Sequence, residues 1–159
     1  MSDAALSWDQ ARRVATAAVQ PRRPVAARLD SCLGCALAAP IEALTDLPAF
    51  DTATMDGFAV AGSSPWHIVG DGVLAGDDPS VRLELGTAAA IATGAAIPIG
   101  TEAVLRSEHG RLETALHGQR LYPLDALTGL PDDTGASVAA GTDIRRRGEE
   151  CAAGEPLVP

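Results

Sequence analysis

The chain has 159 residues, of which 47% are hydrophobic and only 3% aromatic, so we expect a core built mainly from Ala, Val, Leu and Ile. This length fits one ordinary domain or two small ones. The 21 acidic residues outnumber the 12 basic ones and give a net charge of −9, which argues against nucleic acid or an anionic membrane as a partner. The apolar stretches are shorter than the ~20 residues of a membrane span. The N-terminus shows no basic-then-apolar run, so we expect no signal peptide and a cytoplasmic protein.

The first predicted element is a helix that begins after Ser7. Ser7 and Gln10 have the spacing of a capping box, in which each side chain binds the other residue's backbone. Apolar residues then recur at helical spacing, from Trp8 through Val14 and beyond, and Pro21 ends the pattern. We therefore predict an amphipathic helix followed by an extended, proline-containing connector.

Two short elements are predicted after this connector. Alternation over residues 25–29 favours a strand. Asp30 or Ser31 can then cap a short helix that ends before Pro40.

Within this region Cys32 and Cys35 have the C-x-x-C spacing, and Cys151 lies far away in the sequence. A redox motif would require a strand before the pair and a helix after it, and a zinc site would require two more ligands. The three histidines show no ligand spacing with the pair. We interpret both residues as small, partly buried thiols in a packing segment.

Residues 46–60 combine turn-forming residues with three carboxylates. Asp56 and Gly57 predict a tight turn, because glycine tolerates the positive φ that such a corner needs. Alternation from residue 57 to 60 predicts a strand that leaves the turn. Asp51 and Asp56 therefore flank a short, constrained loop, either as turn-stabilising aspartates or as functional carboxylates.

From residue 61 onward the sequence predicts mainly β structure. Apolar and polar residues alternate, or apolar runs end at turn residues, over 66–69, 81–85, 88–92, 102–108, 112–116 and 120–124. Short glycine turns between antiparallel strands favour a small barrel or sandwich over about residues 50–124. Residues 125–137 are polar and contain Gly and Pro, which predicts a flexible segment.

Two further motifs can face a ligand. In the first, the Thr93 hydroxyl stands beside Gly94, whose missing side chain lets a phosphate or oxyanion approach the backbone. The alternative is that Thr93 caps its own turn. In the second, three arginines at 145–147 precede Glu149 and Glu150. One arginine can form a fork with a phosphate or carboxylate, or the cluster is a set of surface ion pairs.

Taken together, these motifs resemble the MoeA family, the molybdopterin molybdenumtransferases, to which the gephyrin E domain is related. The family patterns are D-x-P-x-F-D-x-S-x-M-D-G-Y/F-A, I-M-T-G-A-P-x-P-x-G and G-x-N-I-R-R-x-G-E-D-x-x-x-G. Matching positions are Asp46, Pro48, Phe50, Asp51, Met55, Asp56, Gly57, Phe58, Ala59, Ile91, Thr93, Gly94, Ala95, Pro98 and Gly100. Departures are Ala53, Ala92, Ala96, Ile99, Asp143 for Asn, and Glu150 for Asp.

This resemblance implies a dimeric enzyme that inserts molybdenum from molybdate into adenylylated molybdopterin, with Mg²⁺ and release of AMP. In the family the active site is a cleft between the signature-bearing β domain of one subunit and a MogA-like α/β domain of the other. Carried over to this sequence, the resemblance implies Asp56, Thr93 and Glu150 as catalytic residues. It also implies Thr93, Gly94 and Arg145 as cofactor-binding residues, and Asp56 and Glu150 as metal ligands.

The resemblance covers only the N-terminal part of the family architecture, because the family's T-G-D-E, S-G-G and P-G-N-P motifs have no counterpart here. We therefore expect the chain alone to be inactive and to bind no cofactor tightly. The implied partners are a second copy, MogA-like or C-terminal MoeA domains, or another protein of molybdenum cofactor biosynthesis. A non-catalytic short paralogue that acts as a dimerisation or scaffold module is the first alternative. A carboxylate-based hydrolase using Asp51, Asp56 and Glu108 is the second, although it lacks a nucleophile-and-base arrangement.

The predicted fold class is α+β. Residues 1–49 and 138–159 are expected to form an elongated linker and dimerisation domain, with the N-terminal helix and short strands. Residues 50–137 are expected to form a compact antiparallel β domain, barrel- or sandwich-like, inserted into it.

Overall fold

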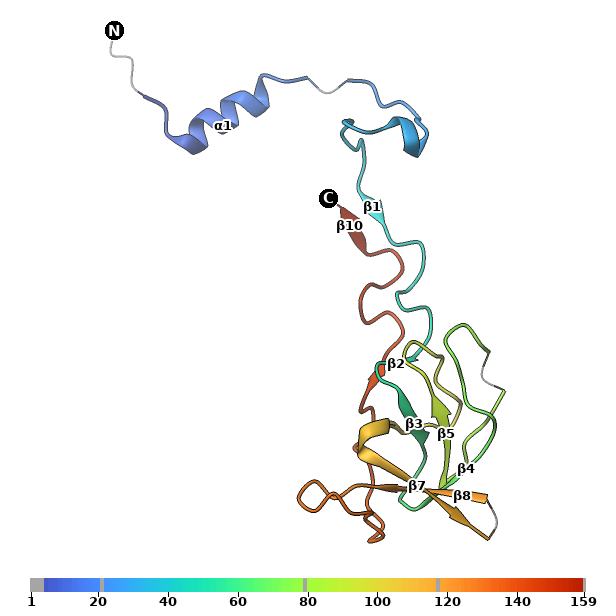
Figure 1. Ribbon diagram of the computed structural model, residues 1–159. Helices are drawn as coiled ribbons and strands as arrows, with labels where there is room; N and C mark the ends of the chain where they lie inside the picture. The colour runs from blue at the N-terminus through green and yellow to red at the C-terminus, as the bar shows by residue number, and fades with distance from the viewer. Residues whose placement is uncertain (1–4, 21, 79, 117, 159) are drawn as a thin grey trace. The chain divides into compact units, whose positions relative to one another are not determined.

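The computed structural model describes residues 5–20, 22–78, 80–116 and 118–158 (Figure 1). The chain divides into two compact units, residues 1–40 and residues 41–159. In the described part of the chain, no helix is long and apolar enough to cross a membrane.

The first unit contains the predicted N-terminal helix, α1 (Trp8–Ala17). The capping box is confirmed: the Gln10 backbone N–H donates to Ser7 Oγ at 3.3 Å, and the Ser7 N–H donates to Gln10 Oε1 at 2.9 Å. The helix ends at Ala17, with Ala18 as its C-cap; Pro21, where we predicted the end, lies outside the described residues. No residue of α1 is buried, and Trp8 is 82% exposed. The apolar face of the helix is therefore uncovered.

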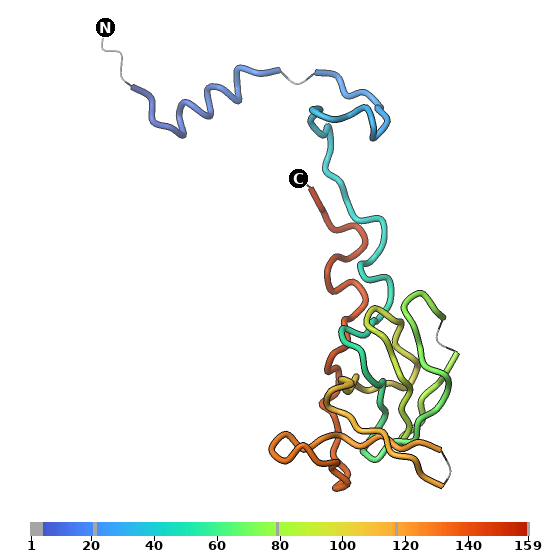
Figure 2. Tube along the Cα trace, in the orientation of Figure 1, coloured from blue at the N-terminus to red at the C-terminus, as the bar shows by residue number. Residues whose placement is uncertain are grey.

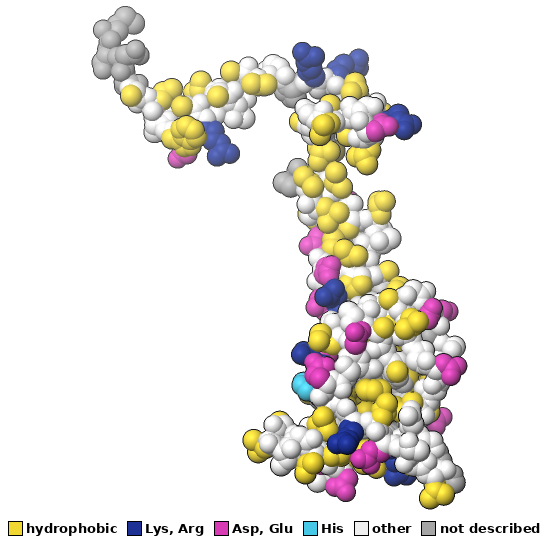
Figure 3. Space-filling view, in the orientation of Figure 1, with side chains coloured by type: hydrophobic (Ala, Val, Ile, Leu, Met, Phe, Trp, Pro, Cys, Tyr) yellow, Lys and Arg dark blue, Asp and Glu magenta, His cyan; other side chains and the backbone are white. Residues whose placement is uncertain are grey.

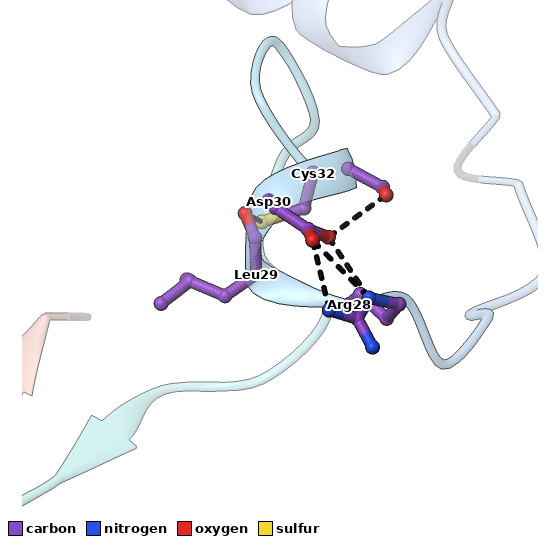
Figure 4. A network of polar contacts seen from close by, with 5 residues as sticks. Arg28, Leu29, Asp30 and Cys32 are labelled. Atoms are coloured by element: carbon purple, nitrogen blue, oxygen red, sulfur yellow. Dashed lines mark hydrogen bonds and ion pairs between the residues drawn. The ribbon is translucent and has the colours of Figure 1, made fainter.

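The rest of the first unit differs from the prediction. Residues 25–28 belong to no helix or strand and pair with no strand among the described residues, so the strand predicted at 25–29 is wrong. The predicted helix after Asp30 is also wrong, because only the 3-10 turn η1 (Leu29–Ser31) forms. An ion pair of 2.9 Å between Arg28 and Asp30 and the nearby Cys32 thiol surround this turn (Figure 4). Local side-chain contacts thus stabilise a single turn where no packing partner extends it.

In its described residues, the second unit contains ten short strands and one 3-10 turn. In chain order they are β1 (Ile41–Glu42), β2 (Thr52–Ala53), β3 (Gly57–Val60), β4 (Trp66–Ile68), β5 (Thr87–Ile91), β6 (Ala103–Arg106), η2 (Ser107–His109), β7 (Gly110–Ala115), β8 (Gly118–Pro123), β9 (Ile144–Arg145) and β10 (Pro156–Val158). Among the described residues, the regular secondary structure is therefore mostly β-sheet, with one α-helix.

Six of these strands form one sheet in the order β6-β3-β5-β4-β8-β7. All neighbouring pairs are antiparallel except β4 and β5, which run parallel. The largest fully buried apolar side chains besides Pro98 belong to two core clusters: Trp66, Leu121 and Val60 pack in one, and Val104 packs in the other. The strand predicted at 81–85 is wrong: the segment makes only the single bridge Arg82–Ile99, although Leu83 is buried.

The turn predicted at Asp56 and Gly57 is wrong in its reason for the glycine. Gly57 is the first residue of β3 and has no positive φ. Instead, a Cβ at this position would lie 2.1 Å from the Leu105 carbonyl oxygen on β6. Glycine is required here because two backbones approach closely, not because the chain turns.

Two-stranded ladders connect the ends of the second unit. β1 pairs with β10, β2 pairs with β9, and an isolated bridge joins Leu47 to Cys151 between them. The tube in Figure 2 shows residues 41–52 and 144–158 running side by side. These pairings bring the first and third sequence motifs together; the predicted division into an elongated domain and an inserted β domain stays a prediction.

Candidate functional site

The centre of the candidate site is a contact between Asp56 and Thr93. Asp56 immediately precedes β3, and Thr93 follows the end of β5. Because Gly57 pairs with Ile91 in the antiparallel register of these strands, the two residues meet at one end of the sheet. The Thr93 backbone N–H donates to Asp56 Oδ1 at 2.7 Å, and the Thr93 hydroxyl donates to the same oxygen at 2.9 Å. The hydroxyl of Thr93 therefore binds Asp56 instead of capping its own turn.

These two hydrogen bonds stabilise the ionised form of the Asp56 carboxylate. They lower the pKa of Asp56, the backbone N–H contributing most and the hydroxyl next. Both residues are exposed. Asp56 Oδ2 accepts no hydrogen bond from any described residue, so an ionised oxygen with free lone pairs faces solvent.

The loop that carries Asp56 is also held through its backbone. The Ser107 N–H donates to the Asp56 carbonyl at 3.0 Å, and the Thr54 N–H donates to the Asp143 carbonyl at 3.0 Å. The N–H of Gly94, the residue after Thr93, donates to the Ala53 carbonyl at 2.8 Å. The Asp56 carboxylate is therefore preorganised by its neighbours.

An open groove of about 360 Å³ begins at Asp56 and runs along the end of β5. Its other wall is the segment 71–74, whose Val73 N–H donates to the Ala90 carbonyl at 2.9 Å. Asp56 and Asp71 are the charged residues that line it, together with the apolar Val73, Leu74 and Ile91. The groove therefore offers carboxylates and apolar surface, and no cationic group lines it.

Arg145 and Glu150 form a second group of predicted site residues. Arg145 Nη1 lies 2.9 Å from Glu150 Oε1, and the two side chains are 46% and 48% exposed. Arg145 lies on β9 opposite Thr52, which precedes Ala53 on β2. Within the described chain, no hydrogen bond or ion pair connects this group with Asp56 or Thr93. The structure thus brings Asp56 and Thr93 together, and separately Arg145 and Glu150.

The family resemblance implies Asp56 and Glu150 as metal ligands. In the residues that the structure describes, no three or more His, Cys, Asp or Glu side chains gather closely enough to hold a metal ion. Asp56 and Glu150 each offer a single carboxylate, and Glu150 already binds Arg145. In the described residues, Asp56 and Glu150 therefore form no shared magnesium site, and a magnesium ion, which takes six oxygen ligands, would need ligands from elsewhere.

Ion pairs, one of the two alternatives predicted for the arginines at 145–147, hold the first and third motifs together, with Asp46 and Asp51 as partners that the sequence did not indicate. Arg146 Nη1 lies 2.6 Å from Asp51 Oδ2, and the Arg147 N–H donates to Asp51 Oδ1 at 2.8 Å. Arg147 Nε pairs with Asp46, whose other oxygen accepts the Ala153 N–H at 2.8 Å. We call these four side chains, Asp46, Asp51, Arg146 and Arg147, the charge clamp. In Figure 3 acidic and basic side chains lie next to one another where the paired segments meet the sheet.

The charge clamp argues against the alternative of a carboxylate-based hydrolase that uses Asp51, Asp56 and Glu108. Asp51 is bound by Arg146 and Arg147, and Glu108 is bound by its neighbour Ser107 at 3.2 Å. Neither carboxylate shares a hydrogen bond with Asp56 in the described part of the chain. The three carboxylates do not form one acid–base group.

The site is therefore an open, carboxylate-bearing groove on a β-rich region, beside a preorganised Asp–Thr pair. The family described as "MoeA N-terminal region (domain I and II)" matches residues 6–159. The chain therefore belongs to the MoeA family and corresponds to its N-terminal region.

Curated relatives agree with this assignment. The chain is 30% identical over 163 residues to "Molybdopterin molybdenumtransferase 2" of Mycobacterium tuberculosis, and this match covers 96% of the chain and 36% of the relative. It is 33% identical over 148 residues to "Molybdopterin molybdenumtransferase" of Synechococcus elongatus, covering 86% of the chain and 32% of the relative. The chain thus spans about a third of the length of these relatives.

Solved structures give the same result. A crystal structure of the molybdopterin biosynthesis MoeA protein from Pyrococcus horikoshii matches with a TM-score of 0.57 and 29% identity, over 75% of this chain and 29% of that chain. A second structure of the P. horikoshii protein matches with a TM-score of 0.59 at 24% identity, over 82% and 33%, and supports the fold.

Proposed function

We propose that this chain is the N-terminal region of a molybdopterin molybdenumtransferase and acts in molybdenum cofactor biosynthesis. In this proposal it supplies one wall of the site at which molybdate is inserted into adenylylated molybdopterin. The remaining wall comes from a MogA-like domain, either in the same larger protein or in a partner. The observation that carries the proposal is the double hydrogen bond from Thr93 to Asp56 at the mouth of the groove.

The chemistry of this pair restricts what Asp56 can do. An ionised carboxylate accepts hydrogen bonds or binds cations, and it repels an oxyanion such as molybdate. Thr93 uses both its N–H and its hydroxyl on Asp56, so neither is free to bind an anion in this state. We therefore assign Asp56 Oδ2 to a hydrogen-bond donor of molybdopterin, or to a cation carried by the phosphates of the substrate.

Magnesium enters this proposal only with ligands from outside the chain. Mg²⁺ is commonly bound through one or two carboxylates plus substrate phosphates, and Asp56 can supply one carboxylate. Arg145 is the chain's candidate for a phosphate contact, and it reaches a phosphate only if its ion pair with Glu150 opens. Gly94 is assigned to close approach of the ligand, because its N–H is already bound to Ala53.

The test is a chimera in which this chain replaces the matching part of the M. tuberculosis relative. The readouts are AMP release and molybdenum bound to the product, with adenylylated molybdopterin and molybdate supplied. We expect activity in the chimera and none in the isolated chain. Asp56→Asn should lower turnover by about tenfold or more, which corresponds to about 1.4 kcal/mol of lost transition-state stabilisation.

Glu113→Gln, on the exposed strand β7, is the matched control because it removes a carboxylate far along the chain from the site. An Asp56→Asn chimera as active as the Glu113→Gln chimera would overturn the assignment of Asp56. Turnover by the isolated chain would instead support an independent enzyme.

The non-catalytic scaffold remains the second candidate function, and one observation favours it: Glu150, predicted to hold a metal, is occupied by Arg145. In this case the chimera would be inactive while the chain still bound a partner.

We also propose that α1 is covered by a second copy of the chain or by the remainder of the larger protein. Trp8 and Val14 are 82% and 59% exposed, and burying them would remove apolar surface from water. Light scattering after size exclusion tests self-association, and Trp8→Ser should shift the chain toward monomer.

A further inference from the structure

The first unit contains a tight turn with a cysteine at each end, Cys32 and Cys35. The Cys35 N–H donates to the Cys32 carbonyl at 3.0 Å, which closes a β-turn over residues 32–35. Gly34, at the third position of this turn, has φ +84°, the value that a type II turn requires. The first and fourth Cα atoms of a β-turn lie within about 7 Å, and disulfides join Cα atoms about 4.4–6.8 Å apart. The turn therefore places the two Cα atoms in the range that a disulfide can join.

This turn is open to solvent. Cys35 is exposed, Cys32 is partly exposed, and Leu33 between them is 99% exposed. A Cβ added at Gly34 would meet no atom within 4 Å, so no neighbouring segment crowds the turn. Cys32 and Cys35 are both free cysteines. The Cys32 thiol donates to the Leu29 carbonyl at 3.0 Å, beside the Arg28–Asp30 ion pair (Figure 4).

We propose that Cys32 and Cys35 form a reversible dithiol–disulfide pair that exchanges with small-molecule disulfides of the glutathione type. This is a modification site separate from the Asp56 groove, and it does not depend on the function proposed for that groove. It replaces the interpretation of the pair as small, partly buried thiols in a packing segment: Cys32 is partly buried, but Cys35 is exposed.

The exchange proceeds in two balanced steps. The more exposed Cys35 attacks as a thiolate on one sulfur of the small disulfide, whose S–S bond breaks and releases the first small thiolate. Cys32 then gives up its hydrogen bond to Leu29 and attacks the Cys35 sulfur, which releases the second small thiolate. Two electrons pass from the protein dithiol to the oxidant, and the two protein thiol protons end on the two released thiols.

Cys151 is an internal control for the Cys32–Cys35 pair, because it is a buried thiol in the same chain. It is only 7% exposed, and its thiol lies against the Ala152 carbonyl at 3.6 Å. Burial raises the pKa of the Cys151 thiol, and the nearby Glu155 carboxylate raises it further. We therefore expect Cys151 to stay reduced under conditions that oxidise the exposed pair.

The experiment uses the complete chain, reduced and then freed of reductant in the presence of a chelator. Glutathione disulfide is added, free thiols are alkylated after denaturation, and intact mass and peptide masses are measured. We expect a product that carries one alkyl group, at Cys151, and no glutathione. Apart from this alkyl group, its mass should be that of the reduced chain less two hydrogen atoms. A peptide containing an internal Cys32–Cys35 bond should be recovered, and a thiol reductant should reverse the change.

Serine variants complete the test. Cys32→Ser and Cys35→Ser each keep one exposed thiol and should stop at a glutathione adduct, because the second step has no attacking group. Both positions are exposed or partly exposed, so the fold is expected to tolerate a single sulfur-to-oxygen change, which circular dichroism checks. Cys151→Ser should react as the unaltered chain does. The proposal is overturned if the unaltered chain accumulates a stable glutathione adduct, or if the pair forms disulfide-linked dimers in place of the internal bond.

Discussion

Arg106 and Asp143 face each other through two parallel hydrogen bonds, from Nε to Oδ2 at 2.8 Å and from Nη2 to Oδ1 at 2.9 Å. Asp143 has φ 53°, a left-handed conformation that Asp and Asn adopt more readily than other side chains. Its backbone carbonyl accepts the Thr54 N–H, at the start of the loop that carries Asp56. This ion pair therefore fixes the backbone that positions the candidate site.

We expect Asp143→Asn to destabilise the chain less than Asp143→Ala, because Asn keeps the tolerance for positive φ and loses only the charge. For Asp143→Ala we expect a loss of about 2 kcal/mol, roughly half from the left-handed backbone and half from the ion pair. We assign no larger part of the lost stability to the ion pair, because the Arg106 side chain is 39% exposed and solvent screens the interaction. Urea unfolding of the unaltered chain, Asp143→Asn and Asp143→Ala measures the order of their free energies of unfolding.

The pH dependence of the same variants gives a second check. The hydrogen bonds from Arg106 are the largest cause that lowers the pKa of Asp143. The folded-state pKa lies below the unfolded one, so the stabilisation is present above the ordinary carboxyl pKa and is lost as pH falls through the lowered value. The stability difference between the unaltered chain and Asp143→Asn should therefore shrink in acid. A difference that stays constant with pH would contradict the assigned ion pair.

Replacement of Gly57 by Ala should unfold or strongly destabilise the second unit. The added Cβ would lie 2.1 Å from the Leu105 carbonyl oxygen, and neither strand backbone can move away without breaking the β3–β6 ladder. We expect a cost of roughly 3 kcal/mol or more. Gly76→Ala is the control: its φ is +94° but no atom lies within 4 Å, so only backbone strain of about 1 kcal/mol should appear. Equal thermal midpoints for the two variants would refute the close-approach argument.

The sequence predicted elements whose signals are local. The capping box of Ser7 and Gln10 placed the start of α1, and alternation placed β4, β5 and the β7–β8 hairpin close to their observed bounds. Alternation reports which side of a segment is buried, but not whether a partner strand exists. For this reason the segment around Leu83 buries its side chain yet forms no strand.

The site was only partly predictable for a related reason. Asp56 and Thr93 were singled out by family motifs, but their direct contact spans 37 residues and depends on the β3–β5 register. The Arg106–Asp143 pair was missed altogether. An Asp in place of the family's Asn was a usable signal, because both side chains favour positive φ. Its partner on β6 could not be read from spacing.

The charge clamp predicts that acid loosens the contact between the first and third motifs. The pKa of Asp46 is lowered mainly by the Ala153 N–H and next by Arg147, and the pKa of Asp51 mainly by the Arg147 N–H. Both depressions mean that the clamp is intact above the ordinary carboxyl pKa and is lost as pH falls through the lowered values. Amide hydrogen exchange at Arg147 and Ala153, corrected for intrinsic rates, should show protection that declines in acid.

Asp46→Asn should lower the protection of the Ala153 amide already at neutral pH. Asp9→Asn, on the exposed helix α1, is the matched control and should leave this amide unchanged. High salt should weaken the clamp further, because the Arg146 and Arg147 side chains are 59% and 66% exposed. Undiminished protection in the Asp46→Asn variant would show that backbone pairing alone holds these segments.

Substitution of Thr93 separates its two hydrogen bonds to Asp56. Thr93→Val removes the hydroxyl donor but keeps the backbone N–H, whereas Thr93→Ser keeps both. We expect the pKa of Asp56, followed by NMR of its carboxyl carbon, to rise part of the way toward its ordinary value in Thr93→Val and to stay low in Thr93→Ser. The rise is partial because the N–H is the larger cause of the depression.

The control for this measurement is Thr87→Val, at the other end of β5, where the hydroxyl donates to the Glu84 carbonyl and not to Asp56. In that variant the pKa of Asp56 should stay low. Because the folded-state pKa of Asp56 is depressed, the stabilisation from the Thr93 hydroxyl is present above the ordinary carboxyl pKa and is lost in acid. The Thr93→Val penalty should therefore be larger at neutral pH than at acidic pH. If Asp56 titrates identically in Thr93→Val and Thr87→Val, the hydroxyl contact does not hold the carboxylate in solution.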